Sequence, residues 1–366
     1  MSVWLMGLEL FLFSFILSLI LVPAAKKLAV RRGIVDRPGE RKMHHQPKAL
    51  MGGPAIFTAF LFTLAFHFAV FLLRNHLPFS GAALQPHLSM ISAFPLASRR
   101  LLFFLAGAFF IVLLGFWDDK YGTQFPVKIK FLGQFVAAAI VISGGIATNF
   151  MPGHFLDYVI TLFWIVGITN SFNLLDNMDG LSAGVAVIAG IMLFIITIFQ
   201  GQVFTAFILA VFVGSVGGFL PYNLYPSKLF MGDAGSMFLG FFLGSVTVNG
   251  SYVTAASPTY VPVLIPLIIL AVPLFDTFSV MLIRRRRGKP LFAGDKNHFS
   301  HRLVQLGMRQ SEAVTFIYVV TLTVGLMALL LPSAQTWESV VILLQTILIF
   351  VIISFIMFVT GSREQE

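Results

Sequence analysis

Eleven apolar runs, each roughly as long as a bilayer-spanning helix, dominate this 366-residue sequence. They occupy residues 3–25, 51–73, 101–117, 130–148, 155–172, 182–199, 203–221, 235–250, 260–283, 313–332 and 338–360. Only 11% of the residues are charged, whereas soluble domains carry about 25%. We therefore predict an all-α, polytopic integral membrane protein with about 11 transmembrane helices and one domain over residues 1–366, and we exclude a soluble globular protein.

The distribution of positive charge orients these helices. Cytoplasmic loops of membrane proteins carry an excess of Lys and Arg. Of the 24 Lys and Arg residues, 21 fall on one side of the predicted topology, in segments 26–50, 118–130, 222–234, 284–312 and the C-terminal tail. We expect this side to be cytoplasmic, with the N-terminus outside, the C-terminus inside and the protein in the inner (plasma) membrane. The net charge of +9 then indicates contact with an anionic lipid bilayer and no nucleic-acid partner.

A polar island at residues 171–184 interrupts the apolar pattern between two predicted spans. It contains Asn173, Asp176 and Asp179, and carboxylates three residues apart share one face of a helical turn. Such close like charges repel each other unless a cation or a donor lies between them. A divalent metal with phosphate oxygens would neutralise them. The alternative is a polar turn between helices, with Asp as N-cap and Gly as breaker.

Further islands lie on the same predicted side. Asp118 and Asp119 follow the third run, and neighbours in sequence point apart on a helix, so one could face a metal and the other a proton or cation. Lys130 follows, where it could pair with an aspartate or hold a phosphate. The first cytoplasmic loop, with Arg41 and His44, fits either an anion-binding loop or a basic loop that faces lipid.

The remaining two islands bring an aspartate between glycines and a pair of histidines. Asp233 precedes the eighth run, and Asn223 lies ten residues before it. A helix that began there would offer free N–H groups to an anion, although a simple N-cap is the alternative. His298 and His301 share a helical face, next to Arg302, and could ligate metal, donate to phosphate or shuttle protons.

Together, five cytoplasmic segments supply carboxylates, amides and cations. This combination fits a diphosphate substrate with bound Mg²⁺, and its position beside a membrane favours glycosyl or phosphoryl chemistry on a nucleotide. A membrane transporter is the main alternative of another class, but its carboxylates should lie near the middle of the bilayer. Here all carboxylates but Glu9 and Asp276 lie at span ends or in loops. A membrane scaffold would not need acidic groups in three separate segments.

In this order, the islands resemble the motifs of the polyprenyl-phosphate N-acetylhexosamine-1-phosphate transferase superfamily. The motifs are Asp118-Asp119, Asn173-Leu-Leu-Asp176-Asn-Met-Asp179-Gly180-Leu181, Phe230-Met231-Gly232-Asp233-Ala-Gly235-Ser236 and His298-Phe-Ser-His301-Arg302. The first loop fits as well, and the match covers nearly the whole chain. The chain resembles the bacterial undecaprenyl-phosphate N-acetylglucosamine-1-phosphate transferases more than the muramoyl-pentapeptide branch, whose run of adjacent histidines it lacks.

The resemblance implies transfer of a sugar-1-phosphate, most simply N-acetylglucosamine-1-phosphate, from a UDP-sugar to undecaprenyl phosphate, with release of UMP. Phospho-N-acetylmuramoyl-pentapeptide transfer is the alternative within the superfamily. It also implies Mg²⁺ or Mn²⁺ at a cytoplasmic-face site, and a homodimer is one expected assembly. Carried over to this chain, the catalytic residues are Asp118, Asp119, Asp176 and Asp179, and the metal ligands are Asp233 and Asp119. The substrate-binding residues are Lys130, Asn173, Asn223, His298, His301, Arg302, Arg41 and His44.

Two positions depart from the pattern of the superfamily. Asn177 stands where the superfamily often has Gly, and Ser300 stands where it often has His. Both changes leave the charged residues in place but bear on sugar specificity, because the last island is expected near the sugar. Asp157, which we assign to an outer loop, receives no role.

Overall fold

The computed structural model describes residues 3–36, 47–73, 94–149, 154–254, 257–288 and 297–363, and these residues are almost entirely helical. The one pair of strands among them is short and antiparallel, β1 (Val35–Asp36) with β2 (Lys48–Ala49). The long helices are α1 (Val3–Arg32), α2 (Gly52–Leu73), α4 (Phe94–Tyr121), α5 (Val127–Ser143), α6 (Phe155–Leu175), α7 (Leu181–Phe199), α8 (Val203–Asn223), α9 (Gly232–Asn249), α11 (Ala271–Arg286), α13 (Gln310–Leu330) and α14 (Thr336–Arg363). The short ones are η1 (Gly122–Gln124), η2 (Val261–Leu264), α10 (Ile265–Ile269), α12 (Phe299–Gln305) and η3 (Leu331–Ser333).

The helices confirm an all-α polytopic membrane protein. Eight helices of the described chain are long and apolar enough to cross a membrane, and a bent pair brings the number to nine. The predicted fourth and eighth runs correspond to α5 and α9, which have 17 and 18 residues and do not belong to those eight. Each of the eleven predicted runs therefore falls on helical structure, while the number of spans remains a prediction.

The ninth predicted run is broken rather than straight. The segments Val261–Ile269 and Ala271–Arg286 meet at an angle of 69°. Pro266 is the second residue of α10, and Pro273 lies in the first turn of α11. Proline lacks a backbone N–H and fits the first turn of a helix, which explains why the run divides here into two helices.

Helix α9 forms the centre of the bundle. Every residue from 234 to 248 is buried, as expected for a helix that is apolar on all sides. Its aromatic side chains pack against neighbouring helices, and the rings of Phe242 and Phe212 stack 3.9 Å apart. At its start the helix α4 comes very close, because a Cβ at Gly115 would lie 2.5 Å from Ala234 Cα. The residue that precedes Ala234, Asp233, is thus held in the middle of one end of the bundle.

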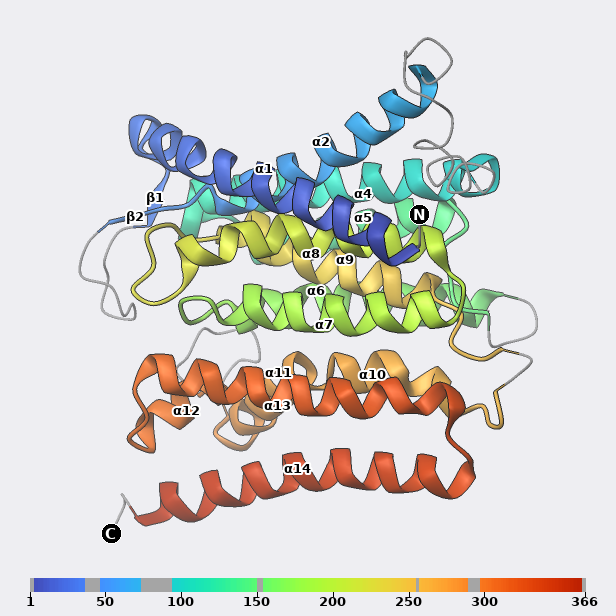
Figure 1. Ribbon diagram of the computed structural model, residues 1–366. Coiled ribbons are helices and arrows are strands. Elements are labelled where there is room, and N and C mark those ends of the chain that lie inside the picture. Colours follow the sequence, from blue (N-terminus) through green and yellow to red (C-terminus); the bar gives the residue numbers. More distant parts are fainter. Residues whose placement is uncertain are drawn as a thin grey trace.

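Figure 1 shows the helices running side by side, with the two termini at opposite ends of the bundle. The end that carries the C-terminus also carries the strands, α12 and the two loops that join α6 to α7 and α8 to α9. All the described islands of the sequence analysis gather at this end. Helix α14 lies at the outside of the bundle, next to α13.

The assignment of Asp157 to an outer loop was wrong. Asp157 lies in the first turn of α6 and is fully buried, and its Oδ1 accepts a 2.9 Å hydrogen bond from the Thr148 hydroxyl. Acidic residues are favourable in the first turn of a helix, and burial requires such a partner. Asp157 is therefore a structural residue of this end of α6.

Candidate active site

Lys130 joins two carboxylates that come from different helices. Its Nζ lies 2.7 Å from Asp118 Oδ2, near the end of α4, and 3.2 Å from Asp233 Oδ2, at the start of α9. The side chains of Lys130 and Asp118 are largely withdrawn from water, and charges in such places need partners of opposite sign. The prediction that Lys130 pairs with an aspartate is confirmed, and the lysine holds the ends of α4, α5 and α9 together.

Asp119 turns away from Asp118, as predicted for neighbours on a helix. Its Oδ1 accepts a 2.7 Å hydrogen bond from the backbone N–H of Asp233, and its Oδ2 accepts one of 3.1 Å from Ala234. These N–H groups have no partner within α9 and carry partial positive charge. The N–H groups that the sequence offered to an outside anion are therefore occupied by Asp119.

Gly232 makes this contact possible. Its φ is 74°, a left-handed conformation that side chains disfavour, and a Cβ there would lie 2.5 Å from Asp119 Oδ2. Any other residue at this position would push the carboxylate away from the start of α9.

Asn173, near the end of α6, completes the first group of site residues. Its Nδ2 donates hydrogen bonds of 2.5 Å to Asp233 Oδ1 and 2.9 Å to Ser236 Oγ. One oxygen of Asp233 is thus fixed by an amide and the other by Lys130. The structure brings together Asp118, Asp119, Lys130, Asn173 and Asp233, which we call the carboxylate cluster.

The loop between α6 and α7 lies next to this cluster. Asp176 follows α6 directly, and its partial burial, with the negative charges of Asp233 and Asp179, raises the pKa of Asp176 to about 8. Asp179 Oδ2 accepts a 2.9 Å hydrogen bond from the backbone N–H of Ser227, in the loop between α8 and α9. Asp179 thereby ties one site loop to the other.

Asn223 makes a second tie between the same two loops. Its Oδ1 accepts from the Gly180 backbone N–H at 3.1 Å, and its Nδ2 donates to the Leu229 carbonyl at 3.0 Å. Both functional ends of the buried amide are therefore engaged by backbone groups. Its assignment to substrate binding remains a prediction, whereas its role in holding the loops is direct.

A second group of predicted residues gathers around Asp276 of α11. The buried Asp276 carboxylate lies 2.8 Å from His298 Nδ1 through Oδ2 and accepts a 2.5 Å hydrogen bond from the Phe299 N–H through Oδ1. A carboxylate at Nδ1 fixes the imidazole tautomer and orientation. Arg302 donates to Ser279 Oγ at 2.8 Å, and the His301 ring centroid is 6.2 Å from that of His298. We call His298, His301 and Arg302 the histidine segment.

A hydrogen bond connects α12, which carries His301 and Arg302, to the loop that carries Asp176. Ser300 Oγ donates to Asn177 Oδ1 at 2.6 Å, and Asn177 Nδ2 donates in turn to the Leu174 carbonyl at 2.8 Å. These are the two positions that depart from the superfamily pattern, and they contact each other.

Two predicted site residues cannot be placed, and several residues that contact the site were not predicted. Arg41 and His44 lie outside the described residues. The sequence reasoning missed the partners Ser236, Asp276, Ser279 and the Asn177–Ser300 pair. Asp276 carried a usable signal, because ionisable residues within apolar helices are costly and tend to serve a function. The serines carried no such signal, since the role of a serine hydroxyl depends on the side chain to which it is hydrogen-bonded.

The donor set at the carboxylate cluster fits Mg²⁺ or Mn²⁺. Asp118 and Asp233 share the single ammonium of Lys130, and Asp119 lies against the backbone N–H of Asp233. Asp176 is close enough to Asp233 for the two negative charges to interact, so negative charge exceeds positive charge in this region. Among the described residues no three acidic or His side chains surround one point. Mg²⁺ proteins commonly supply one or two carboxylates and leave the other positions to phosphate oxygens and water. Asp233, at the centre, is the residue best positioned to hold such an ion.

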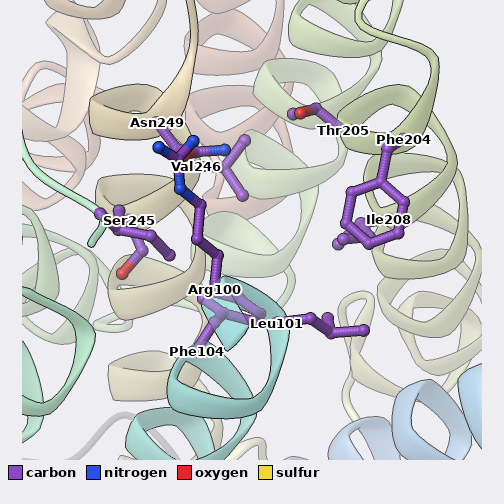
Figure 2. A pocket seen from close by; sticks show the side chains of 10 residues that line it. Arg100, Leu101, Phe104, Phe204, Thr205, Ile208, Ser245, Val246 and Asn249 are labelled. Atoms are coloured by element: carbon purple, nitrogen blue, oxygen red, sulfur yellow. The ribbon is translucent and has the colours of Figure 1, made fainter. Parts of the chain in front are cut away.

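A small cavity lies at the opposite end of the bundle, between α4, α8 and α9. Figure 2 shows Arg100 reaching toward Asn249, to which it donates a 3.4 Å hydrogen bond, beside Thr205 and Phe204. Its volume of about 40 Å³ admits a few water molecules but no nucleotide sugar. No carboxylate lines it, and it does not compete with the carboxylate cluster as a candidate active site.

Comparison with known proteins identifies the family to which the chain belongs. Residues 101–251, which contain the whole carboxylate cluster, match the model of glycosyl transferase family 4. The chain is 34% identical over 353 residues, which are 94% of this chain and 90% of the relative, to a probable undecaprenyl-phosphate N-acetylglucosaminyl 1-phosphate transferase of Bacillus subtilis. A decaprenyl-phosphate N-acetylglucosaminephosphotransferase of Mycolicibacterium smegmatis is 31% identical over 82% of this chain and 75% of the relative.

A third relative comes from another bacterium. It is an undecaprenyl-phosphate alpha-N-acetylglucosaminyl 1-phosphate transferase of Yersinia pestis, 27% identical over 90% of this chain and 84% of the relative. The protein is a polytopic membrane enzyme of the transferase class. It belongs to glycosyl transferase family 4, and the resemblance seen in its motifs is confirmed.

Proposed function

We propose that this protein transfers N-acetylglucosamine-1-phosphate from UDP-N-acetylglucosamine to undecaprenyl phosphate. The products are UMP and undecaprenyl-diphosphate-N-acetylglucosamine, and the reaction is the first membrane step of a cell-envelope polysaccharide. The names of the relatives support this activity. The observation that carries it is Lys130 between Asp118 and Asp233, a cation among carboxylates of different helices at one end of an apolar bundle.

The topology proposed from the charge distribution fits this reaction. Eleven spans with the N-terminus outside put the carboxylate cluster and the histidine segment at the cytoplasmic face of the inner membrane, where UDP-sugars are made. The lipid acceptor reaches the same level from within the bilayer. The single-domain organisation over residues 1–366 and a homodimer belong to the same proposal.

The bonds that form and break in this reaction determine what the active site must provide. An oxygen of the acceptor phosphate attacks the sugar-linked phosphorus of the donor, a new P–O bond forms, and the bond to the bridging oxygen breaks, so that UMP leaves with that electron pair. A phosphate monoester has a second pKa near 6 and is mostly a dianion at neutral pH. It needs little help from a base, and the main obstacle is its repulsion from the anionic donor.

The residues divide this work. Lys130 brings positive charge to the phosphates, and Asp118 holds the Lys130 ammonium in place and accepts any residual proton from the acceptor. Asn173 fixes the carboxylate of Asp233, and Asp119 fixes the backbone that carries Asp233. Asp276 orients His298, which with His301 and Arg302 is proposed to contact the diphosphate and the sugar.

A divalent ion held by Asp233, with Asp119 near it, would neutralise phosphate charge and polarise the P–O bonds. Asp118 and Asp176 lie around the same region, and their charges would be relieved by such an ion. The proposal therefore includes dependence on Mg²⁺, with Mn²⁺ as a substitute.

Release of UMP by the purified protein tests the function. We expect UMP from UDP-N-acetylglucosamine only when undecaprenyl phosphate is present, and much less when a short soluble alkyl phosphate replaces the lipid. UMP release at equal rate from UDP-N-acetylmuramoyl-pentapeptide would assign the protein to the other branch of the superfamily. No UMP from any UDP-sugar would leave the transporter alternative.

A burst measurement separates direct attack from a covalent aspartyl intermediate. With donor alone, direct attack predicts no UMP, whereas the covalent route predicts one UMP per active site before the acceptor is added.

A further inference from the structure

A groove of about 550 Å³ lies on the side of α1 that faces the loop between α8 and α9. Its apolar wall includes Val22, Pro23 and Val30. The basic side chains at the same groove are Lys26, Lys27, Arg31 and Lys228. No acidic residue lines it, and none of the four basic side chains forms an ion pair within the described chain. The groove therefore combines an apolar surface with four uncompensated positive charges.

The position of the groove along α1 matters for its ligand. The basic residues follow the apolar part of the helix, at the end of the bundle that carries the site loops. Before them on α1, Ile16 and Ile20 are exposed and face away from the protein core. A ligand that puts an anionic group among the lysines can therefore run an apolar chain back along α1. Basic pockets between membrane helices at the cytoplasmic side bind anionic lipid headgroups.

The loop that supplies Lys228 is also part of the active site. The next residue upstream, Ser227, donates its backbone N–H to Asp179, and Lys48 donates to the Ser227 carbonyl. The Lys228 N–H donates to the Tyr222 carbonyl at 2.8 Å, and the Tyr222 hydroxyl donates to the Leu19 carbonyl of α1 at 3.1 Å. A headgroup bound to Lys228 and α1 would thus hold the same loop from its other side.

We propose that this groove binds the headgroup phosphate of an anionic glycerophospholipid of the surrounding membrane. The site is separate from the carboxylate cluster, because no residue of the cluster lines the groove. The bound lipid fastens that loop to α1 and so keeps Asp179 and Asp233 in their relative positions.

Binding of phosphatidylglycerol to the full-length protein tests this site without any assay of transfer. The protein is reconstituted in phosphatidylcholine discs with a minor fraction of phosphatidylglycerol, extracted gently, and the retained lipid is identified by native mass spectrometry. We expect retention of phosphatidylglycerol over phosphatidylcholine, and we expect the triple variant Lys26→Gln/Lys27→Gln/Lys228→Gln to bind it on the order of 10²-fold more weakly. The double variant Lys120→Gln/Lys128→Gln, exposed on the same predicted face outside the groove, should bind it as the wild type does.

Three outcomes would overturn the proposal. Equal retention of phosphatidylglycerol by the groove variant and by the Lys120/Lys128 variant would mean that the groove is not the site. Displacement by inorganic phosphate at modest concentration would mean that a free anion, not a lipid, is the ligand. Displacement by an equal amount of undecaprenyl phosphate would assign the groove to the acceptor. The single variant Lys228→Gln should show a smaller loss of the same kind if the triple variant is poorly folded.

Discussion

Ser300 donates a 2.6 Å hydrogen bond to Asn177, and this contact joins the two regions that carry the functional groups. Asn177 follows Asp176 in the loop after α6, and Ser300 lies in α12 between His298 and His301. Both residues depart from the superfamily pattern, and together they make a partly buried contact. The pair therefore links the loop that carries Asp176 to the helix that carries His301 and Arg302.

We expect the effects of Ser300→Ala and Asn177→Ala on kcat/KM to be non-additive. Each single change should remove about 1 kcal/mol, a loss of roughly fivefold, and the double variant should be little worse than either single one. A double-mutant cycle on kcat/KM for the UDP-sugar provides the measurement. Ser333→Ala is the control, because its exposed hydroxyl contacts only the local Leu330 carbonyl. Fully additive losses would show that the two residues act independently.

Asp119→Asn should reduce stability as well as activity. Asp119 gives one oxygen to each of two N–H groups at the start of α9, whereas an amide has only one oxygen and turns an NH₂ group toward the other. We expect the free energy of unfolding to fall by about 1–3 kcal/mol and added Mg²⁺ to leave the loss of activity unchanged. Thermal unfolding of the detergent-solubilised protein measures the first effect. An Asp119→Asn protein that unfolds at the wild-type temperature would refute the capping role.

The raised pKa of Asp176 predicts a pH-dependent stability of the metal-free protein. Between the ordinary value of 3.8 and about 8, the folded state binds more protons at this carboxyl than the unfolded state. Stability therefore falls as pH rises through that window. Asp176→Asn removes this slope, so in EDTA the variant should gain stability over the wild type from pH 5 to pH 8. A difference in Tm between the two proteins that is independent of pH would contradict this.

The sidedness of the membrane topology can be tested in the natural cysteine-free background. Tyr260 is 84% exposed at the predicted outer end, and Lys120 is exposed at the predicted cytoplasmic end. In sealed cells, a membrane-impermeant maleimide should label Tyr260→Cys and should label Lys120→Cys only after permeabilisation. The reverse pattern would invert the orientation and put the site outside the cell.

The sequence predicted the helical fold and the central members of the site, for a clear physical reason. Apolar runs of bilayer length have few alternatives to helices, and charged residues at their ends are costly enough to stand out. Adjacent carboxylates such as Asp118 and Asp119 could be expected to diverge, because helical geometry separates neighbours by about 100°.

Contacts between distant segments could not be predicted in the same way. The sequence alone does not predict that Ser300 contacts Asn177 or that Asp276 contacts His298, since each pair is more than twenty residues apart in sequence. The break between α10 and α11 lies in one predicted run, and the prolines of that run, Pro266 and Pro273, did not by themselves show that it divides into two helices. Asp157 was misassigned because burial depends on its neighbour Thr148 and not on its own position at the edge of an apolar run.

Turnover of Asp233→Asn at several Mg²⁺ concentrations tests the carboxylate cluster most directly. The amide keeps the shape of the side chain and can still accept from Asn173, but it removes the charge that faces Lys130. We expect UMP release from UDP-N-acetylglucosamine and undecaprenyl phosphate to fall at least about 10²-fold, and higher Mg²⁺ to restore part of it. Glu312→Gln, which removes an exposed carboxylate paired with Arg309, should keep full activity. Near-full turnover by Asp233→Asn, or an equal loss in Glu312→Gln, would contradict the assignment of Asp233 to the catalytic centre.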